Sequence, residues 1–177
     1  AAPYLMFVPV QDWENPKPAG DPKILLDGWN YSADTHETLN TCTWGPDGWL
    51  YGCHGVFCPS NPGKPGTPAT QRQWMDAGVW RYHPTRHVFE VFTEGGSNPW
   101  GIDFHEHGQL FAEMCVIPHF SDMIQGARIE RQGGEHFTVG PDETSRYRKG
   151  AGKPVHPHIY EDIKQHGDHV HWAGNAG

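Results

Sequence analysis

A tight turn that leads into a short aromatic strand occurs twice in this sequence, and the repeat limits the folds that the chain can adopt. The first copy is GPDG at 45–48 followed by WLY at 49–51, and the second is HEHG at 105–108 followed by QLF at 109–111. Proline presets the backbone of a turn, and glycine tolerates positive φ. Alternating apolar and polar residues precede the first turn, as in a half-buried strand. Both copies therefore predict a β-hairpin.

The composition favours a turn-rich β protein over a helical one. The chain of 177 residues has 22 glycines and 16 prolines, which long helices tolerate poorly. Only 36% of the residues are hydrophobic, yet there are 8 tryptophans, 8 phenylalanines and 6 tyrosines, so we expect an aromatic core. Four short antiparallel strands per repeated unit are typical of a β-propeller blade. We expect an all-β fold: a partial β-propeller of about two to three blades, with long loops and little helix.

The expected strands divide one domain, residues 1–177, into blade-like units at about 4–56 and 78–119. The proline-rich stretch 57–73 predicts a long loop between them. Segment 120–177 is expected to be irregular and rich in histidine, with a short helix at 120–126 and a helical turn at 160–166. Strands are predicted at 5–8, 23–27, 39–44, 49–51, 78–82, 87–93, 100–104 and 109–111. Because propellers close with about four to eight blades, we expect the rest of a larger polypeptide to complete the ring.

Charge and cysteine content limit the partners. The formal net charge is -8, and lysine and arginine are scattered, so no nucleic-acid partner is expected. No apolar run approaches the roughly 18 residues of a membrane span. The four cysteines are expected to form one or two disulfides or to be buried free thiols. They are Cys42, Cys53, Cys58 and Cys115.

The polar loop before the first hairpin contains the candidate catalytic residue. His36 lies in the run DTHET, immediately before a predicted strand, where a blade would present its rim. A histidine can take a proton from a hydroxyl, and Asp34 or Glu37 would orient its ring. The alternative is a rim histidine that is bonded to a neighbouring backbone carbonyl. We therefore treat His36 as a candidate general base, with Asp34 and Glu37 as substrate- or cofactor-binding residues.

The matching loop of the second unit contains Asn98 and Trp100. Because this loop is in register with the His36 loop, we expect both residues to face the same axial funnel and to contact substrate or cofactor. The alternative for Asn98 is a turn-forming asparagine before proline. Arg128 is a candidate for an anionic ligand, or else a solvated charge. His105 and His107 occupy the second turn and are expected to be exposed.

Several further histidines define a candidate metal site. His54 and His119 follow the expected inner strands of the two units, at equivalent positions, which indicates a shared pocket. Histidine is the commonest metal ligand, and His169 or His171 from the C-terminal cluster would complete the site. The alternative is a set of structural histidines that are bonded locally. The metal would be a divalent ion.

The chain resembles the propeller of large bacterial proteins of the membrane-bound dehydrogenase family. The resemblance is carried by DTHETLNTCTWGPDGWLYGCHGVF, GVWRYHPTRHVFEVF, GSNPWGIDFHEHGQLF and IYEDIKQHGDHVHWAGN, and it covers nearly the whole chain. In that family helical repeats and a haem c segment follow the propeller. The resemblance implies a periplasmic or extracellular location and a chain that continues in the full-length protein.

A more distant similarity is to soluble quinoprotein glucose and sorbosone dehydrogenases. In those enzymes a histidine before a GPDG-type turn is the general base beside pyrroloquinoline quinone, and His36 is the matching position. Their quinone-holding arginine lies in an RNP triplet, which here is Ser97-Asn98-Pro99, so serine replaces it. Their calcium-binding loop is not recognisable in CVIPHF at 115–120. The similarity thus implies pyrroloquinoline quinone and calcium as cofactors, with this key arginine replaced.

Three functions follow from these observations. The first is a periplasmic oxidoreductase of sugars or polyols, in which His36 abstracts the hydroxyl proton while hydride leaves for a quinone or another acceptor. In this function Asn98 and His54 would position substrate or cofactor. The second is a non-catalytic propeller that binds a carbohydrate or a partner through exposed aromatic side chains. The third is the histidine-based metal site. In each case the expected ligand is small or carbohydrate.

Overall fold

The computed structural model describes residues 3–96, 98–115 and 120–129, and within these ranges the chain is built of β-strands without an α-helix. The expected all-β class is confirmed. The strands are β1 (Leu5–Phe7), β2 (Lys23–Leu26), β3 (Cys42–Trp44), β4 (Leu50–His54), β5 (Gly78–His83), β6 (Val88–Gly95), β7 (Pro99–Phe104), β8 (Leu110–Met114), β9 (Phe120–Asp122) and β10 (Arg128–Ile129). One short 3₁₀ turn, η1 (Ala69–Gln71), lies in the proline-rich loop. These ranges contain no helix with the length and apolarity to cross a bilayer.

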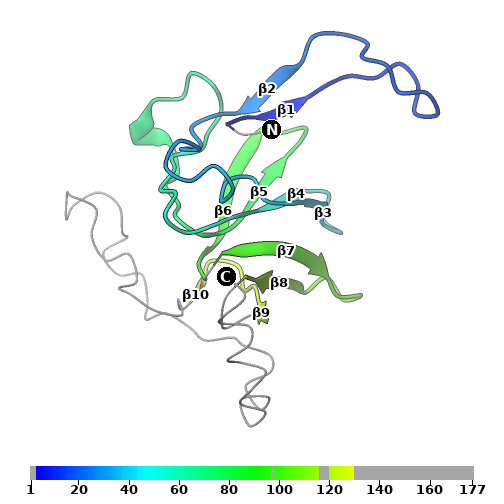
Figure 1. Ribbon diagram of the computed structural model, residues 1–177. Helices are drawn as coiled ribbons and strands as arrows, with labels where there is room; N and C mark the ends of the chain where they lie inside the picture. Colours follow the sequence, from blue (N-terminus) through cyan, green and yellow to red (C-terminus); the bar gives the residue numbers. More distant parts are fainter. Residues whose placement is uncertain (1–2, 97, 116–119, 130–177) are drawn as a thin grey trace.

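The strands form three sheets (Figure 1). The central sheet has five strands in the order β10-β6-β5-β4-β3. Its pairs are antiparallel except for β10, which is parallel to β6. The second sheet has three strands, β7-β8-β9, and the third is the hairpin β1-β2. The hairpin and the three-stranded sheet lie on opposite sides of the central sheet.

The two repeated hairpins have the same geometry, as the sequence predicts. In the first, Trp44 pairs with Leu50, the Gly45 amide donates to Trp49 O at 2.8 Å, and Gly48 has φ +80°. In the second, Phe104 pairs with Leu110. There the corresponding donation, from the His105 amide to Gln109 O, is also 2.8 Å, and the Gly108 φ is +85°. Positive φ explains why glycine ends both turns.

Side chains alternate along the strands of the central sheet, so they point to both of its faces. Each face packs in a hydrophobic cluster. Val79 packs in a cluster between this sheet and β7–β9, together with Tyr51 and Phe92. Its neighbour Trp80 points to the other face, in a second cluster with Leu26 of β2. Large aromatic side chains occur in both clusters, but most of the buried hydrophobic residues are aliphatic or sulfur-containing, so the core is less aromatic than the composition predicts. The central sheet is therefore the inner layer of three.

The grouping of strands into units at 4–56 and 78–119 is wrong. β3 and β4 were expected to complete the first unit. They instead share the central sheet with β5 and β6 of the second unit, through the pairing of β4 with β5. β1 and β2 form a separate hairpin, and β7 and β8 join β9. A sequence repeat fixes its period but leaves its phase open. After β4 the chain runs through the loop 55–77 and returns as β5, which is antiparallel to β4. In chain order, each of the two larger sheets therefore begins with one of the repeated hairpins.

Two other expectations about the chain need correction. The short helix at 120–126 is wrong: β9 extends the second sheet there, and Phe120 stacks on Phe111 at 5.6 Å between ring centroids. The buried Ser121 and Met123 flank Asp122 with the period of a strand. The predicted disulfides are also wrong, since all four cysteines are free. The other alternative, buried thiols, holds for Cys53 and Cys58, whereas Cys42 is exposed. The helical turn at 160–166 lies outside the described residues.

The proline-rich loop 57–73 has no regular strand, as expected, and Arg72 holds it to the sheet beneath. The Arg72 guanidinium forms an ion pair with Asp27, which follows β2. Arg72 Nε–H donates to Thr67 O at 2.7 Å, and the Asp27 and Gly63 backbones bond to each other at 3.0 and 3.1 Å. One cation thus organises a loop that composition alone describes as irregular.

Replacing Arg72 by methionine is expected to lower the free energy of unfolding by about 2 kcal/mol, because it leaves Asp27 and several carbonyls without their donor. The Arg72 side chain is 12% exposed, so water replaces the lost bonds poorly. Urea unfolding measures the change. Lys64→Met, an exposed cation of the same loop, is the matched control and should alter stability by less than about 0.5 kcal/mol. Equal effects of the two substitutions would contradict the assignment.

Candidate functional site

The loop that contains His36 lies along the end of strand β4. The Gly55 amide donates to Glu37 O at 2.7 Å, and the Asn40 amide donates to Cys53 O at 3.2 Å. Behind the loop, the buried Cys58 thiol contacts two of its carbonyls, Asn30 O at 3.0 Å and Asp34 O at 3.6 Å. The backbone that presents the polar run DTHET is therefore fixed on both sides.

His36 lies between two carboxylates. Its Nδ1 is 2.9 Å from Asp34 Oδ1, and its Nε2 is 3.3 Å from Glu37 Oε1. The His36 side chain is 69% exposed, whereas that of Asp34 is 25% exposed and that of Glu37 only 5%. The structure thus brings together the three residues that the sequence placed in one loop. A solvent-accessible imidazole with an oriented ring is a common component of acid–base sites.

Glu37 has a buried carboxylate, although it belongs to a polar surface loop. Burial is the main cause that raises its pKa, the His36 charge lowers it, and Asp34 raises it further. Its Oε2 has no hydrogen-bond partner among the described residues. Gly55 makes the space for this carboxylate, because a Cβ at position 55 would come within 2 Å of Oε2. Sequence reasoning did not include Gly55 in the site. The available signal was a glycine directly after His54, a residue that was itself a candidate.

The second sheet contributes Trp100 to the same place. The Trp100 ring, on β7, stacks on the His36 imidazole with centroids 6.2 Å apart and an interplanar angle of 24°. Asn40 Nδ2–H also donates to Pro99 O at 3.3 Å, which joins the two loops. The expectation that these loops face one another therefore agrees with the geometry. Trp100 limits the orientations open to the His36 ring.

Asn98 has a structural task in this arrangement. Its Oδ1 accepts a hydrogen bond from the Val56 amide at 2.8 Å, and its carbonyl accepts one from the Cys115 amide at 3.1 Å. Its φ of +52° lies in the left-handed region, which asparagine adopts more readily than most residues. Asn98 thus holds the β7 loop against the chain that leaves β4. The side-chain oxygen is used for this bond rather than aimed at a ligand.

His54 lies in the core rather than at a surface. It is 0% exposed, its ring packs on Trp29 at 5.4 Å, and its Nε2 is 2.7 Å from Cys58 O. The carbonyl makes Nε2 the donor, so Nδ1 is left as a buried acceptor without a partner among the described residues. Burial lowers the pKa of His54 from the ordinary 6.5 to about 4. Its surroundings support the alternative of a locally bonded histidine.

Arg128, the one remaining predicted site residue that the structure describes, does not join His36. Arg128 lies on β10 and is aligned, through Glu94 of β6 and Gly78 of β5, with His54 of β4. Three strand spacings separate β10 from β4, which is about 14 Å. Ser97, His119, His169 and His171 lie outside the described residues. The Cys58 thiol, which supports the Asp34 carbonyl, was missed as part of the site, and no local sequence signal identifies it.

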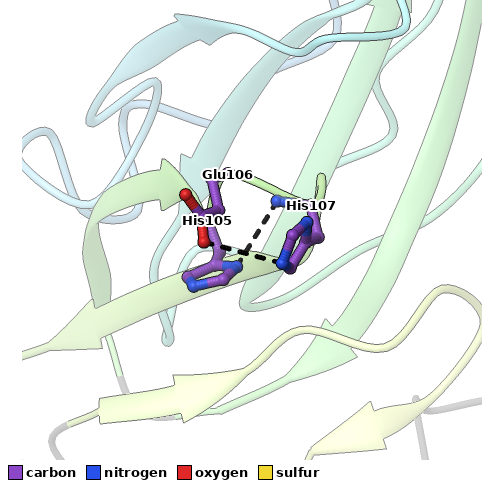
Figure 2. Close-up of side chains that lie close together, drawn as sticks. All are labelled: His105, Glu106 and His107. Carbon is purple, nitrogen blue, oxygen red and sulfur yellow. Dashed lines mark hydrogen bonds and ion pairs between the residues drawn. The ribbon is translucent and has the colours of Figure 1, made fainter.

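A second cluster of potential ligands lies at the turn between β7 and β8 (Figure 2). His105, Glu106 and His107 are all exposed there, as the sequence predicts for the two histidines. The His107 amide is 3.4 Å from His105 Nδ1, and His107 Nε2 is 3.5 Å from Glu106 Oε1. Among the described residues, the ring neighbours of His105 are the exposed His107 and the half-buried Phe111, so no fully buried group fixes these side chains.

Together the fold and these contacts define an all-β protein of three sheets, with a histidine–carboxylate cluster in a loop at one end of the central sheet. Residues 1–176 match the family model described as domain of unknown function, DUF7133. The chain belongs to this family. No curated protein and no solved structure gives a significant match. The function must therefore be argued from the site.

Proposed function

We propose that this chain is part of a β-propeller and oxidises a hydroxyl group of a sugar or polyol, with His36 as the general base. The observation that supports this best is the setting of the imidazole. It is 69% exposed, bonded through Nδ1 to Asp34 at 2.9 Å and stacked on Trp100. A ring that is fixed in plane and tautomer, yet open to solvent, suits proton abstraction from a small hydroxylic substrate.

The propeller assignment rests on the repeated hairpins and on the sheets that lie face to face. The antiparallel strands β3 to β6 would be one complete blade, and β7 to β9 would belong to the next. The hairpin β1-β2 would be part of the preceding blade. The rest of a larger polypeptide would then supply the missing blades. The periplasmic or extracellular location rests on the family resemblance alone.

The proposed reaction removes two electrons and two hydrogens from the substrate. His36 Nε2 takes the hydroxyl proton while the hydrogen on the adjacent carbon leaves as hydride for an external two-electron acceptor, and a carbonyl forms. Asp34 holds the Nδ1–H, which keeps Nε2 free of a proton at the start. The Glu37 carboxylate, 3.3 Å from Nε2, then stabilises the imidazolium that results.

The sequence and the residues around His36 do not fit pyrroloquinoline quinone as a bound cofactor. Serine replaces the arginine that holds the quinone, and Asn98 uses its side-chain oxygen on the Val56 amide. Among the described ion pairs, none brings arginine or lysine to Asp34, His36 or Glu37 to replace the arginine that holds the quinone. We therefore leave the acceptor as an external one.

The test is turnover of a panel of sugars and polyols with an artificial dye as electron acceptor. His36→Ala is expected to lower kcat/KM by at least about a hundredfold, the usual contribution of a general base. Asp34→Asn should also lower it, through the wrong tautomer of His36. The double variant His105→Ala/His107→Ala, in the exposed turn, is the matched control and should keep full activity. Unchanged turnover in His36→Ala would refute the proposal.

A second candidate is a binding module without catalysis, which the exposed aromatic side chains favour. Trp13 is 88% exposed, Phe57 68% and Trp44 62%. Aromatic faces of this kind stack on sugar rings and anchor protein partners. Binding of a sugar in calorimetry, with no dye reduction by any of the panel, would favour this function over the oxidoreductase.

A further inference from the structure

We propose that His36 and Glu37, with Asp34 orienting the imidazole, form a binding site for a divalent transition-metal ion, best suited to Zn²⁺. Each of the three residues offers a ligand atom, and these atoms lie within 4.8 Å of one another. The site differs from the one that the sequence suggested, which combined His54 with the more C-terminal histidines. His54 is buried and bonded to Cys58 O, so it is closed to an ion.

The spacing of two ligand atoms already matches tetrahedral coordination. Zinc bonds of about 2.0–2.1 Å place neighbouring ligand atoms about 3.4 Å apart in a tetrahedron. His36 Nε2 and Glu37 Oε1 are 3.3 Å apart. Asp34 Oδ1 holds the opposite ring nitrogen at 2.9 Å, the arrangement in which a carboxylate orients a metal-binding histidine. The ring is thus preset with Nε2 directed to the Glu37 carboxylate.

An independent observation at Glu37 favours cation binding. Its side chain is only 5% exposed, and its Oε2 has no hydrogen-bond partner among the described residues. Buried carboxylate oxygens are normally paired, because leaving one unpaired is costly. An ion bound at Oε1 would neutralise this buried carboxylate, whose Oε2 lies against Gly55 without a donor among the described residues. Gly55 preserves the space in which this carboxylate lies.

The chemistry of the donors selects the ion. An imidazole nitrogen beside a carboxylate oxygen suits zinc and its first-row neighbours, whereas calcium prefers oxygen ligands alone and a higher coordination number. Because His36 is 69% exposed, water can complete the coordination. A metal ion on Nε2 would also occupy the lone pair that abstracts the proton in the proposed reaction. The ion would therefore inhibit turnover, but its binding does not depend on that function.

The experiment is a Zn²⁺ titration of the full chain by isothermal calorimetry, after metal is removed with a chelator and the chelator is dialysed away. Co²⁺ absorbance reports the coordination geometry. The variants are His36→Ala and Glu37→Gln, which remove one ligand each. His36 is exposed, so its substitution should not affect folding, and circular dichroism checks both variants. The matched control is His105→Ala/His107→Ala, which removes the exposed cluster.

We expect the tightest Zn²⁺ equivalent to bind at least about tenfold more weakly in both ligand variants and unchanged in the control. We also expect tetrahedral Co²⁺ absorbance in the parent and its loss in both variants. Parental affinity in either His36→Ala or Glu37→Gln would overturn the site, as would loss of the tight equivalent in the control. Because binding is read without substrate, its failure would leave the proposed oxidation standing, and the reverse also holds.

Discussion

Replacing Trp80 by alanine is expected to lower the free energy of unfolding by about 3–5 kcal/mol. Trp80 is 0% exposed in the middle of β5, where its ring packs on Trp29 with centroids 5.5 Å apart. Its indole N–H donates to Cys53 O at 3.2 Å. The substitution therefore removes a large apolar surface and leaves a cavity between the hairpin β1-β2 and the central sheet. Guanidinium unfolding followed by circular dichroism measures the change.

Trp44→Ala is the matched control for this prediction. Trp44 lies on the edge strand β3 and is 62% exposed, so its removal should cost less than about 1 kcal/mol. Gly52→Ala offers a second approach to the same contact, because a Cβ at position 52 would meet the Trp80 ring at 2.2 Å. Similar losses from Trp80→Ala and Trp44→Ala would show that the second cluster does not stabilise the fold as described.

The parts of the fold that sequence reasoning predicts are local. The turn at 45–48 follows from proline and glycine and that at 105–108 from glycine and the repeat, and the strands beside them follow from alternation. The pairing of β4 with β5 crosses the 55–77 loop, and no local pattern encodes which strand returns beside β4. This is why the hairpins were predicted correctly and the units were not. Phe120 belongs to the same class, because its strand forms only through pairing with β8.

The candidate site divides in the same way. Asp34, His36 and Glu37 are close in sequence, so their meeting was predictable, and the repeat placed Trp100 in the facing loop. The burial of Glu37 was not predictable, because DTHET reads as a solvated run until Gly55 and β4 are placed beside it. For His54, sequence position indicated a pocket, whereas its surroundings are hydrophobic. Side-chain direction along a strand depends on register, which the repeat alone does not fix.

His54 predicts a loss of stability in mild acid. Burial lowers the pKa of His54 from 6.5 to about 4. Below pH 6.5 the unfolded chain takes up a proton on this ring while the folded chain does not, so folding becomes less favourable as pH falls. The loss continues until pH about 4, where the folded form is protonated too. Across this window it amounts to about 3 kcal/mol, at about 1.4 kcal/mol per pH unit.

The comparison that isolates this effect is His54→Gln. Glutamine can still donate to Cys58 O but cannot be protonated, so its unfolding free energy should fall less steeply between pH 6.5 and 4 than that of the parent. Carboxylate titration affects both chains and cancels in the difference. His105→Gln, at the exposed turn, should keep the parental slope. The physical cause lies in the buried Nδ1: a proton there would meet no acceptor among the described residues, beside the apolar ring of Trp29. Parallel pH profiles for the parent and His54→Gln would show that the ring can be protonated in the folded chain, and the core position of His54 would then have to be revised.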